Sequence, residues 1–124
     1  MPTGAPPQVR PGTFVSTTDA TATEIWARET RTNKIYAVYL KLIAAETTDS
    51  DEGALYTRQA LYKNDAGTLT LISSNTIGTD IESDNTWTGP TIDANGTEIR
   101  IRVTGLAATN ITWNAIVDIY EIPV

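Results

Sequence analysis

Residues 95–105 read NGTEIRIRVTG, and residues 106–122 continue as LAATNITWNAIVDIYEI. Hydrophobic and polar side chains alternate along both pieces, and such alternation is typical of β-strands that bury one face. The pair Asn95-Gly96 favours a tight hairpin turn just before the first piece. We therefore expect the chain to end in a β-ribbon. Its inward side chains are expected to be Ile99, Ile101, Val103, Ile111, Trp113, Ala115, Val117 and Ile119.

The opposite face of this ribbon is mixed. In the first piece it carries Arg100 and Arg102, for which solvent exposure is expected because they are charged. In the second piece it carries Ile116, Tyr120 and Ile122. Apolar side chains on both sides of one strand indicate that its outward side is also partly covered.

The most apolar segment, from Lys34 to Ala45, reads KIYAVYLKLIAA. Its spacing also suits a buried helix, but its tyrosines, its β-branched residues and the asparagine turn before it favour a strand. One side of that strand carries Tyr36, Val38, Leu40 and Leu42, and the other carries Ile35, Ala37, Tyr39 and Ile43. A strand that is apolar on both sides in a small sandwich with one core predicts a second contact surface.

Other alternating segments complete an all-β chain. Strands are expected at residues 24–30, 54–63, 68–73 and 91–93, and residues 74–90 are expected to be mostly loop. The sequence Asn64-Asp65-Ala66-Gly67 predicts a tight turn with the glycine at positive φ. About eight strands separated by turn signals predict an antiparallel β-sandwich or jelly roll over residues 21–124.

Residues 1–20 differ from the rest, because they hold four of the six prolines in the chain. Proline fixes φ and donates no backbone hydrogen bond, so this segment predicts an extended arm and not a helix or a central strand. We expect the arm to lie on its own domain or on a neighbour, with Phe14 and Val15 as anchors.

The chain has 124 residues, of which 40% are hydrophobic and 19% are charged, and this is the composition of one globular domain. The formal net charge is −6, and the nine lysines and arginines are scattered. Binding to nucleic acid or to an anionic membrane is therefore not expected, because both need a basic face. No apolar run approaches the ~20 residues of a membrane span and no signal pattern is visible, so a soluble protein made in a cytoplasm is expected.

The residue types also limit the chemistry. The chain contains no cysteine and no histidine, which excludes disulfides, thiolate metal sites and the commonest catalytic base. The sequence singles out no catalytic residue and no metal ligand. We therefore expect neither an enzyme nor a cofactor.

Two acidic groups and three aromatic residues leave alternatives open. The acidic groups are Asp49, Asp51 and Glu52, and Asp80, Glu82 and Asp84. Solvated loops are favoured for both, with a cation site as the alternative for each and a sugar site as a further alternative for the second. The aromatic residues are Trp26, Trp87 and Tyr56. Such side chains stack on sugar rings, but packing in the core or between subunits is favoured for each of them.

Three motifs carry a resemblance to a known family. Residues 58–69 match R-x-A-x-x-K-N-x-x-G-T-L, residues 95–105 match N-G-T-x-I-R-I-x-V-T-G, and residues 109–113 match T-N-I-x-W. Acidic residues also precede Trp87. With these motifs, residues 24–122 resemble a β-sandwich domain of tailed bacteriophages, which often ends tail-fibre, tail-spike and other virion-surface proteins. A scaffold and not a set of catalytic residues defines that family, so the resemblance implies no active site.

What the resemblance implies is a phage structural protein that forms a homotrimer. Because the domain here follows a short arm and not a long shaft, it is most similar to a capsid decoration (cement) protein on the outer capsid surface, with the major capsid protein as partner. The implied trimer interface comprises Tyr36, Val38, Leu40, Ile116, Tyr120 and Ile122. The arm residues implied to contact the capsid are Pro6, Pro7, Arg10, Pro11, Phe14 and Val15. The open alternative is a receptor-binding tip, or a head- or tail-fibre knob, that recognises host surface polysaccharide.

Overall fold

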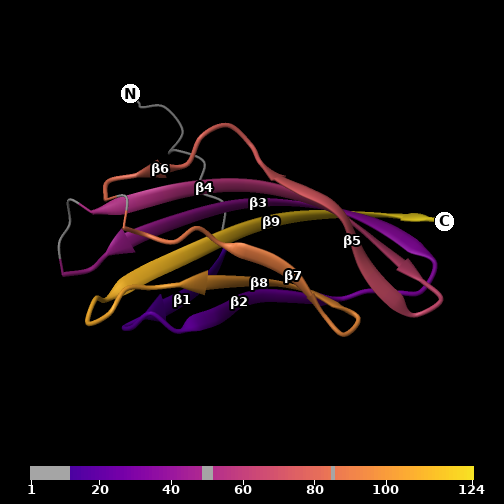
Figure 1. The fold of residues 1–124 in the computed structure, drawn as a ribbon, viewed down its shortest axis with the longest axis horizontal. Coiled ribbons are helices and arrows are strands. Elements are labelled where there is room, and N and C mark those ends of the chain that lie inside the picture. Colours follow the sequence, from indigo (N-terminus) through magenta and orange to yellow (C-terminus); the bar gives the residue numbers. More distant parts are fainter. Residues whose placement is uncertain (1–11, 49–51, 85) are drawn as a thin grey trace, which may run out of the picture.

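The computed structural model describes residues 12–48, 52–84 and 86–124, and in these residues it consists of strands and their connections without a helix. Nine strands form two antiparallel sheets that pack face to face (Figure 1). The all-β sandwich expected from the sequence is therefore confirmed. The strand assignment for the apolar segment from Lys34 is also confirmed.

The larger sheet has six strands and the smaller sheet has three. The order in the larger sheet is β1 (Thr13–Thr17), β9 (Ile111–Pro123), β3 (Lys34–Glu46), β4 (Gly53–Asp65) and β5 (Thr68–Thr76), with the short β6 (Ile81–Glu82) also paired to β4. The order in the smaller sheet is β2 (Ala22–Glu29), β8 (Glu98–Thr104) and β7 (Thr91–Asn95). Figure 1 shows the smaller sheet along one side of the long strands β3, β4 and β9.

The hydrophobic core lies between the two sheets. Successive side chains of a strand point to opposite faces, so every second residue of each long strand enters this layer. Leu40 of β3 and Trp113 of β9 pack there in one cluster with Ile101 and Val103 of β8. Trp113 is fully buried, and its indole Nε1 donates a hydrogen bond of 2.9 Å to Thr17 Oγ1. This bond ties β1 to the core.

The last two strands have the expected positions and buried faces, but they do not pair with each other. β8 pairs with β2 and β7, whereas β9 pairs with β1 and β3. The expectation of one ribbon is therefore wrong, because residues 105–110 carry the chain from one sheet to the other. The crossing is tight: Ala108 has a φ of 52°, and a Cβ on Gly105 would lie 2.6 Å from the Asp19 carbonyl oxygen. Alternation specifies which face of a strand is buried but not which strand it pairs with. The pattern therefore fits two paired strands as well as two strands in different sheets.

Two hairpins form where the turn residues predict them. β7 and β8 meet at Asn95-Gly96, with Gly96 at a φ of 62°. β4 and β5 meet at Ala66-Gly67, with Gly67 at a φ of 91°. Residues 74–90 contain more strand than expected, because β5 continues to Thr76 and β6 pairs with β4. An irregularity in the pairing of β4 with β5 falls between Leu61 and Tyr62.

Part of the predicted arm is an edge strand of the sandwich. β1 pairs with β9 over its whole length, and Val15 packs against the core. Gly12 approaches β9 so closely that an added Cβ would lie 2.6 Å from the Ala115 carbonyl oxygen. The arm was expected to lie either on its own domain or on a neighbour. Residues 13–17 lie on their own domain, as an edge strand paired with β9.

A buried polar network closes one end of the sandwich. Asn64 at the end of β4 is almost fully buried, and its Nδ2 donates a hydrogen bond of 2.9 Å to Thr30 Oγ1. The Thr30 hydroxyl donates to the Thr97 carbonyl oxygen at 2.5 Å, and Asn64 Oδ1 accepts from the Gly67 N–H at 3.0 Å. Through Asn64 and Thr30, this network links the β4–β5 turn of the larger sheet to the β2–β3 connection and to the β7–β8 turn of the smaller sheet.

Candidate functional site

The main surface feature is the side of the larger sheet that points away from the smaller sheet. Val38 and Leu40 of β3 point into the core, so Ala37, Tyr39 and Lys41 point the other way. We call the solvent side of β1, β9, β3, β4 and β6 the outer face. Its exposed large hydrophobic side chains are Phe14, Tyr39, Ile43, Leu55, Leu61, Ile81, Tyr120 and Ile122.

Strand pairing arranges these side chains in rows, because residues directly opposite each other on neighbouring strands point to the same face. One row crosses five strands and consists of Phe14, Asn114, Ile43, Leu55 and Ile81. A second row consists of Tyr120, Ala37 and Leu61. Between the rows, the ring of Tyr39 lies nearly perpendicular to that of Tyr120, with the centroids 6.0 Å apart. The outer face therefore carries two apolar rows that Tyr39 and Ile116 connect, with Asp118, Gln59, Lys41 and Thr57 as the polar side chains between them.

Few charges interrupt the outer face. Between the row that contains Ile35 and the row that contains Phe14, the side chains that are charged at neutral pH are Lys41, Lys63 and Asp118. This is a small share of the acidic chain's charged residues. The outer face is therefore nearly neutral, with two lysines against one aspartate.

Two open hollows flank Tyr39 on the outer face, and Ala37 lines both of them. The hollow over β3, β4 and β5 has a volume of about 250 Å³ and is also lined by Gln59 and Asn75. The hollow over β3 and β9 has a volume of about 610 Å³ and is also lined by Tyr120. The small side chain of Ala37 between larger neighbours is what leaves this space.

The residues expected at a trimer interface fall into two groups. Tyr36, Val38 and Leu40 are buried inside the protomer, with at most 2% of each exposed, so their assignment to an interface is wrong. Ile116, Tyr120 and Ile122 lie on the outer face, where Tyr120 and Ile122 are 61% and 59% exposed. β3 is apolar on both sides, and the position of the smaller sheet decides which side is core.

The arm residues expected to contact a capsid lie only partly in the described chain. Pro6, Pro7, Arg10 and Pro11 lie outside the described residues. Phe14 is exposed on the outer face, and Val15 packs on the core from the other side of β1.

Asp80 and Glu82, two acidic residues that follow β5, are held by side chains of β4. Arg58 donates hydrogen bonds of 2.6 and 2.9 Å to the Asp80 carboxylate and keeps the pKa of Asp80 below its usual range. The Tyr56 hydroxyl donates a hydrogen bond of 2.5 Å to Glu82 Oε2, and burial raises the pKa of Tyr56. These contacts fasten β6 beside β4. The described part of the chain contains no group of three or more Asp and Glu side chains that could hold a metal ion.

Of the remaining acidic residues in question, Glu52 and Asp84 lie in loops. Asp49 and Asp51 are outside the described residues. Glu52 accepts a hydrogen bond of 2.6 Å from the Ser83 hydroxyl, and Asp84 accepts one of 2.9 Å from the Thr86 N–H. Both carboxylates therefore have local structural partners.

Arg100 and Arg102, expected in solvent, lie on the solvent side of the smaller sheet and share one partner. Arg100 Nε is 3.0 Å from Asp93 Oδ1, and an Arg102 guanidinium nitrogen is 2.6 Å from Asp93 Oδ2. Hydrogen bonding, first from Arg100 and then from Arg102, keeps the pKa of the Asp93 carboxyl below its usual range. The group joins β7 to β8.

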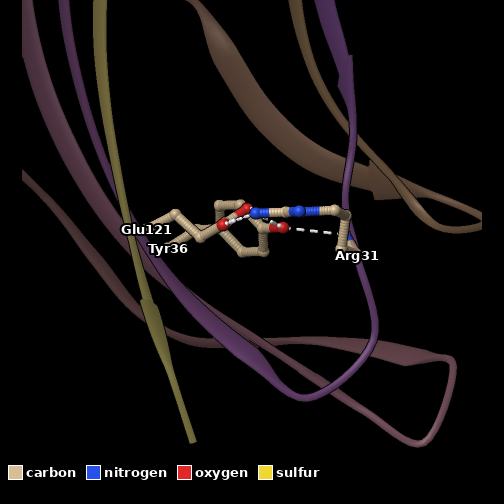
Figure 2. Close-up of polar contacts among 3 residues, drawn as sticks. All are labelled: Arg31, Tyr36 and Glu121. Atoms are coloured by element: carbon tan, nitrogen blue, oxygen red, sulfur yellow. Dashed lines mark hydrogen bonds and ion pairs between the residues drawn. The ribbon is translucent and has the colours of Figure 1, made fainter.

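Figure 2 shows a polar group that sequence reasoning missed, formed by Arg31, Tyr36 and Glu121. The Tyr36 hydroxyl accepts a hydrogen bond of 2.7 Å from the Arg31 backbone N–H and donates one of 2.6 Å to Glu121 Oε2. The Arg31 guanidinium also pairs with the Glu121 carboxylate, and Arg31 first and Tyr36 second lower the pKa of Glu121 to about 2. The group fastens the end of β9 to β3 and to the connection before it. Arg31 and Glu121 are 90 positions apart, and no motif links them.

The three aromatic residues considered for sugar stacking are part of the interior. Tyr56 is fully buried, and Trp87 is 7% exposed and packs against Trp113 with ring centroids 6.0 Å apart. Trp26 is partly buried against the core. Core packing, the favoured interpretation, is therefore confirmed for these residues, and the exposed aromatic side chains of the outer face are Phe14, Tyr39 and Tyr120.

No family model and no curated protein matches the chain. Among solved structures, it is similar to part of the tailspike protein of Acinetobacter baumannii bacteriophage Fri1, a capsular polysaccharide depolymerase, with a TM-score of 0.47 and 11% identity over 88% of this chain. It is also similar to part of the tailspike protein of Acinetobacter baumannii phage AM24, with a TM-score of 0.48 and 10% identity over 90% of this chain. The chain spans only 18% and 26% of the length of these two tailspikes. The similarity concerns the fold alone.

Proposed function

We propose that this chain is a structural protein of a tailed-bacteriophage virion. In this proposal it is a homotrimeric capsid decoration (cement) protein that binds the outer capsid surface and bridges subunits of the major capsid protein. The observation that carries the proposal is the resemblance of residues 58–69 and 95–105 to a virion-surface domain. Both motifs coincide with hairpin strands, β4–β5 and β7–β8, whose turns they supply.

A non-enzymatic role is part of the proposal. Asp80, Glu82 and Asp93 are carboxylates of the kind from which a hydrolase draws an acid and a base. In this fold Arg58 holds Asp80, Tyr56 holds Glu82, and two arginines hold Asp93. These pairings favour a role in fastening strands over a role in chemistry.

The arm supplies the capsid contact in this proposal, through Pro6, Pro7, Arg10 and Pro11. A chain that lacks residues 1–11 tests it, because this deletion spares β1 and its bond to Trp113. The truncated chain is expected to fold and to keep its oligomeric state, but to lose binding to capsids from which the protein has been stripped. Undiminished binding in a co-sedimentation assay with the full-length chain as reference would remove the arm from the proposal.

The second candidate is a receptor-binding tip or fibre knob that recognises host surface polysaccharide. One observation favours it: the hollow beside Tyr39 combines an aromatic ring with the amides of Gln59 and Asn75, and rings and amides are common in sugar sites. Copy number separates the two functions. A decoration protein binds at many sites on each shell, whereas a tip is present in a few copies per particle. Gel densitometry of purified virions against the major capsid protein measures this ratio, and a ratio far below that of a shell-wide component would favour the knob.

A further inference from the structure

The outer face exposes more apolar surface than a lone domain of this size usually does. Its eight large hydrophobic side chains are between 36% and 66% exposed. With on the order of 200 Å² for each such side chain when fully exposed, they present roughly 800 Å² to solvent. The largest apolar patch on a typical monomer is about 300–600 Å², and a stable protein interface covers about 800 Å² on each partner.

We infer that the outer face is the surface through which copies of this chain meet. Its occupant is the outer face of a neighbouring copy, with unlike parts of the two faces in contact around a threefold axis. This inference rests on the homotrimer in the proposed function, and it names the surface that the copies share. It replaces the earlier assignment to Tyr36, Val38 and Leu40, which are core residues.

Charge favours a second copy as the occupant. Each chain carries a formal net charge of −6, so two copies repel each other over most of their surface. The outer face is the exception, because its charged side chains are two lysines, Lys41 and Lys63, and one aspartate, Asp118. Copies therefore approach with least repulsion through this face, and a strongly basic partner finds little negative charge on it.

The shape of the outer face also suits contact with the outer face of another copy. Tyr120 and Ile122 protrude, while Ala37 leaves the two hollows beside Tyr39. Protrusions and hollows lie on one surface, so a symmetry-related copy offers each to the other. Closely fitting apolar side chains are what gives an interface core its packing density.

A polysaccharide is the rival occupant of this face. Its hydroxyl groups need many hydrogen-bonding partners, which Gln59 and Asn75 supply near Tyr39. The row from Phe14 through Ile43 to Ile81 offers mainly hydrocarbon and leaves a sugar chain without such partners. A sugar accounts for one hollow, whereas a second copy accounts for the whole face.

A matched pair of leucines tests the inference. Leu61 is 38% exposed on the outer face, and Leu71 is 42% exposed on the neighbouring strand. Leu71 pairs with Tyr62, an inward residue, and therefore points to the other side of the sheet. Light scattering of the full-length chain is expected to give three times the protomer mass of 13.4 kDa. Leu61→Glu and Tyr120→Glu are expected to reduce it to the protomer mass, and Leu71→Glu is expected to leave it unchanged.

Thiol labelling provides a readout that does not depend on breaking the oligomer. The chain has no cysteine, so Leu61→Cys and Leu71→Cys each carry a single thiol. Leu61→Cys is expected to react several-fold more slowly than Leu71→Cys at a concentration where the oligomer persists, and equally fast in denaturant. Far-ultraviolet circular dichroism confirms that each variant keeps its β-structure.

The outcomes separate this inference from the proposed function. A wild-type chain that is monomeric at all concentrations overturns the inference, and so does an oligomer that both outer-face glutamates leave intact with equal thiol reactivity. Sugar binding by such a monomer at Tyr39 would identify the rival occupant. An oligomer that dissociates as expected but is absent from virions supports the shared face and refutes the virion function.

Discussion

Replacement of Asn64 by alanine tests whether one buried amide holds the end of the sandwich together. Asn64 lies at the last inward position of β4, with 1% of its surface exposed. Its Nδ2 donates to Thr30 Oγ1, and its Oδ1 accepts from the Gly67 N–H. Asn64→Ala removes both hydrogen bonds and leaves a gap between three connections.

The expected change in the free energy of unfolding follows from the two lost hydrogen bonds and the space that the amide leaves. Each intramolecular hydrogen bond contributes about 1 kcal/mol net, and the space left by the missing amide adds up to about 1 kcal/mol. The Thr30 hydroxyl keeps its bond to the Thr97 carbonyl oxygen, and the Gly67 N–H, which loses its acceptor, is exposed to water, so neither donor is left buried without a partner. The free energy of unfolding should therefore fall by about 2–3 kcal/mol. For a chain of 124 residues this corresponds to a fall in Tm of roughly 10 °C.

The assay is thermal and urea unfolding of wild type and variant at equal protein concentration, because any self-association makes Tm depend on concentration. Asn110→Ala is the matched control: its side chain is exposed in a loop, and a change within about 0.5 kcal/mol is expected. Thr30→Val completes a double-mutant cycle with Asn64→Ala and should give a coupling of about 1 kcal/mol. A loss below about 0.5 kcal/mol for Asn64→Ala, or no coupling to Thr30, would refute this account of the network.

Two further predictions concern the edges of the larger sheet. Glu121 has a pKa of about 2 in the fold against an ordinary value of 4.5, so its contribution to stability is present above pH 4.5 and is lost as the pH falls toward about 2. The difference in unfolding midpoint between wild type and Glu121→Gln should shrink over this interval, and a difference independent of pH would contradict the role of the ionised carboxylate. Gly12→Ala should loosen β1, because the new Cβ would lie 2.6 Å from the Ala115 carbonyl oxygen. Amide hydrogen exchange should then speed up in β1 and stay unchanged in β8, and equal protection of β1 in both proteins would show that the strand adjusts without cost.

The tight turns were the part of the fold that the sequence predicted best. Asn95-Gly96 and the Asn64–Gly67 segment specify positive φ locally, and both hairpins form there. The sequence did not predict which sheet β9 joins, because a strand with this alternation can bury its apolar face in either sheet. The same limit explains the group of Arg31, Tyr36 and Glu121, whose members meet only after β9 pairs with β3.

Local sequence was sufficient for most strands, their alternating faces and the tight turns, since a two-residue period and a positive φ are properties of the backbone itself. It missed β1, β6 and the end of β5. It also pointed to a second contact surface on the strand that contains Tyr36 and Tyr39. It could not say which side of that strand is core, because both sides are apolar. The smaller sheet settles this by covering Tyr36, Val38 and Leu40 and leaving Tyr39 and Ile43 uncovered. That choice depends on pairings between strands far apart in the chain, which no single segment encodes.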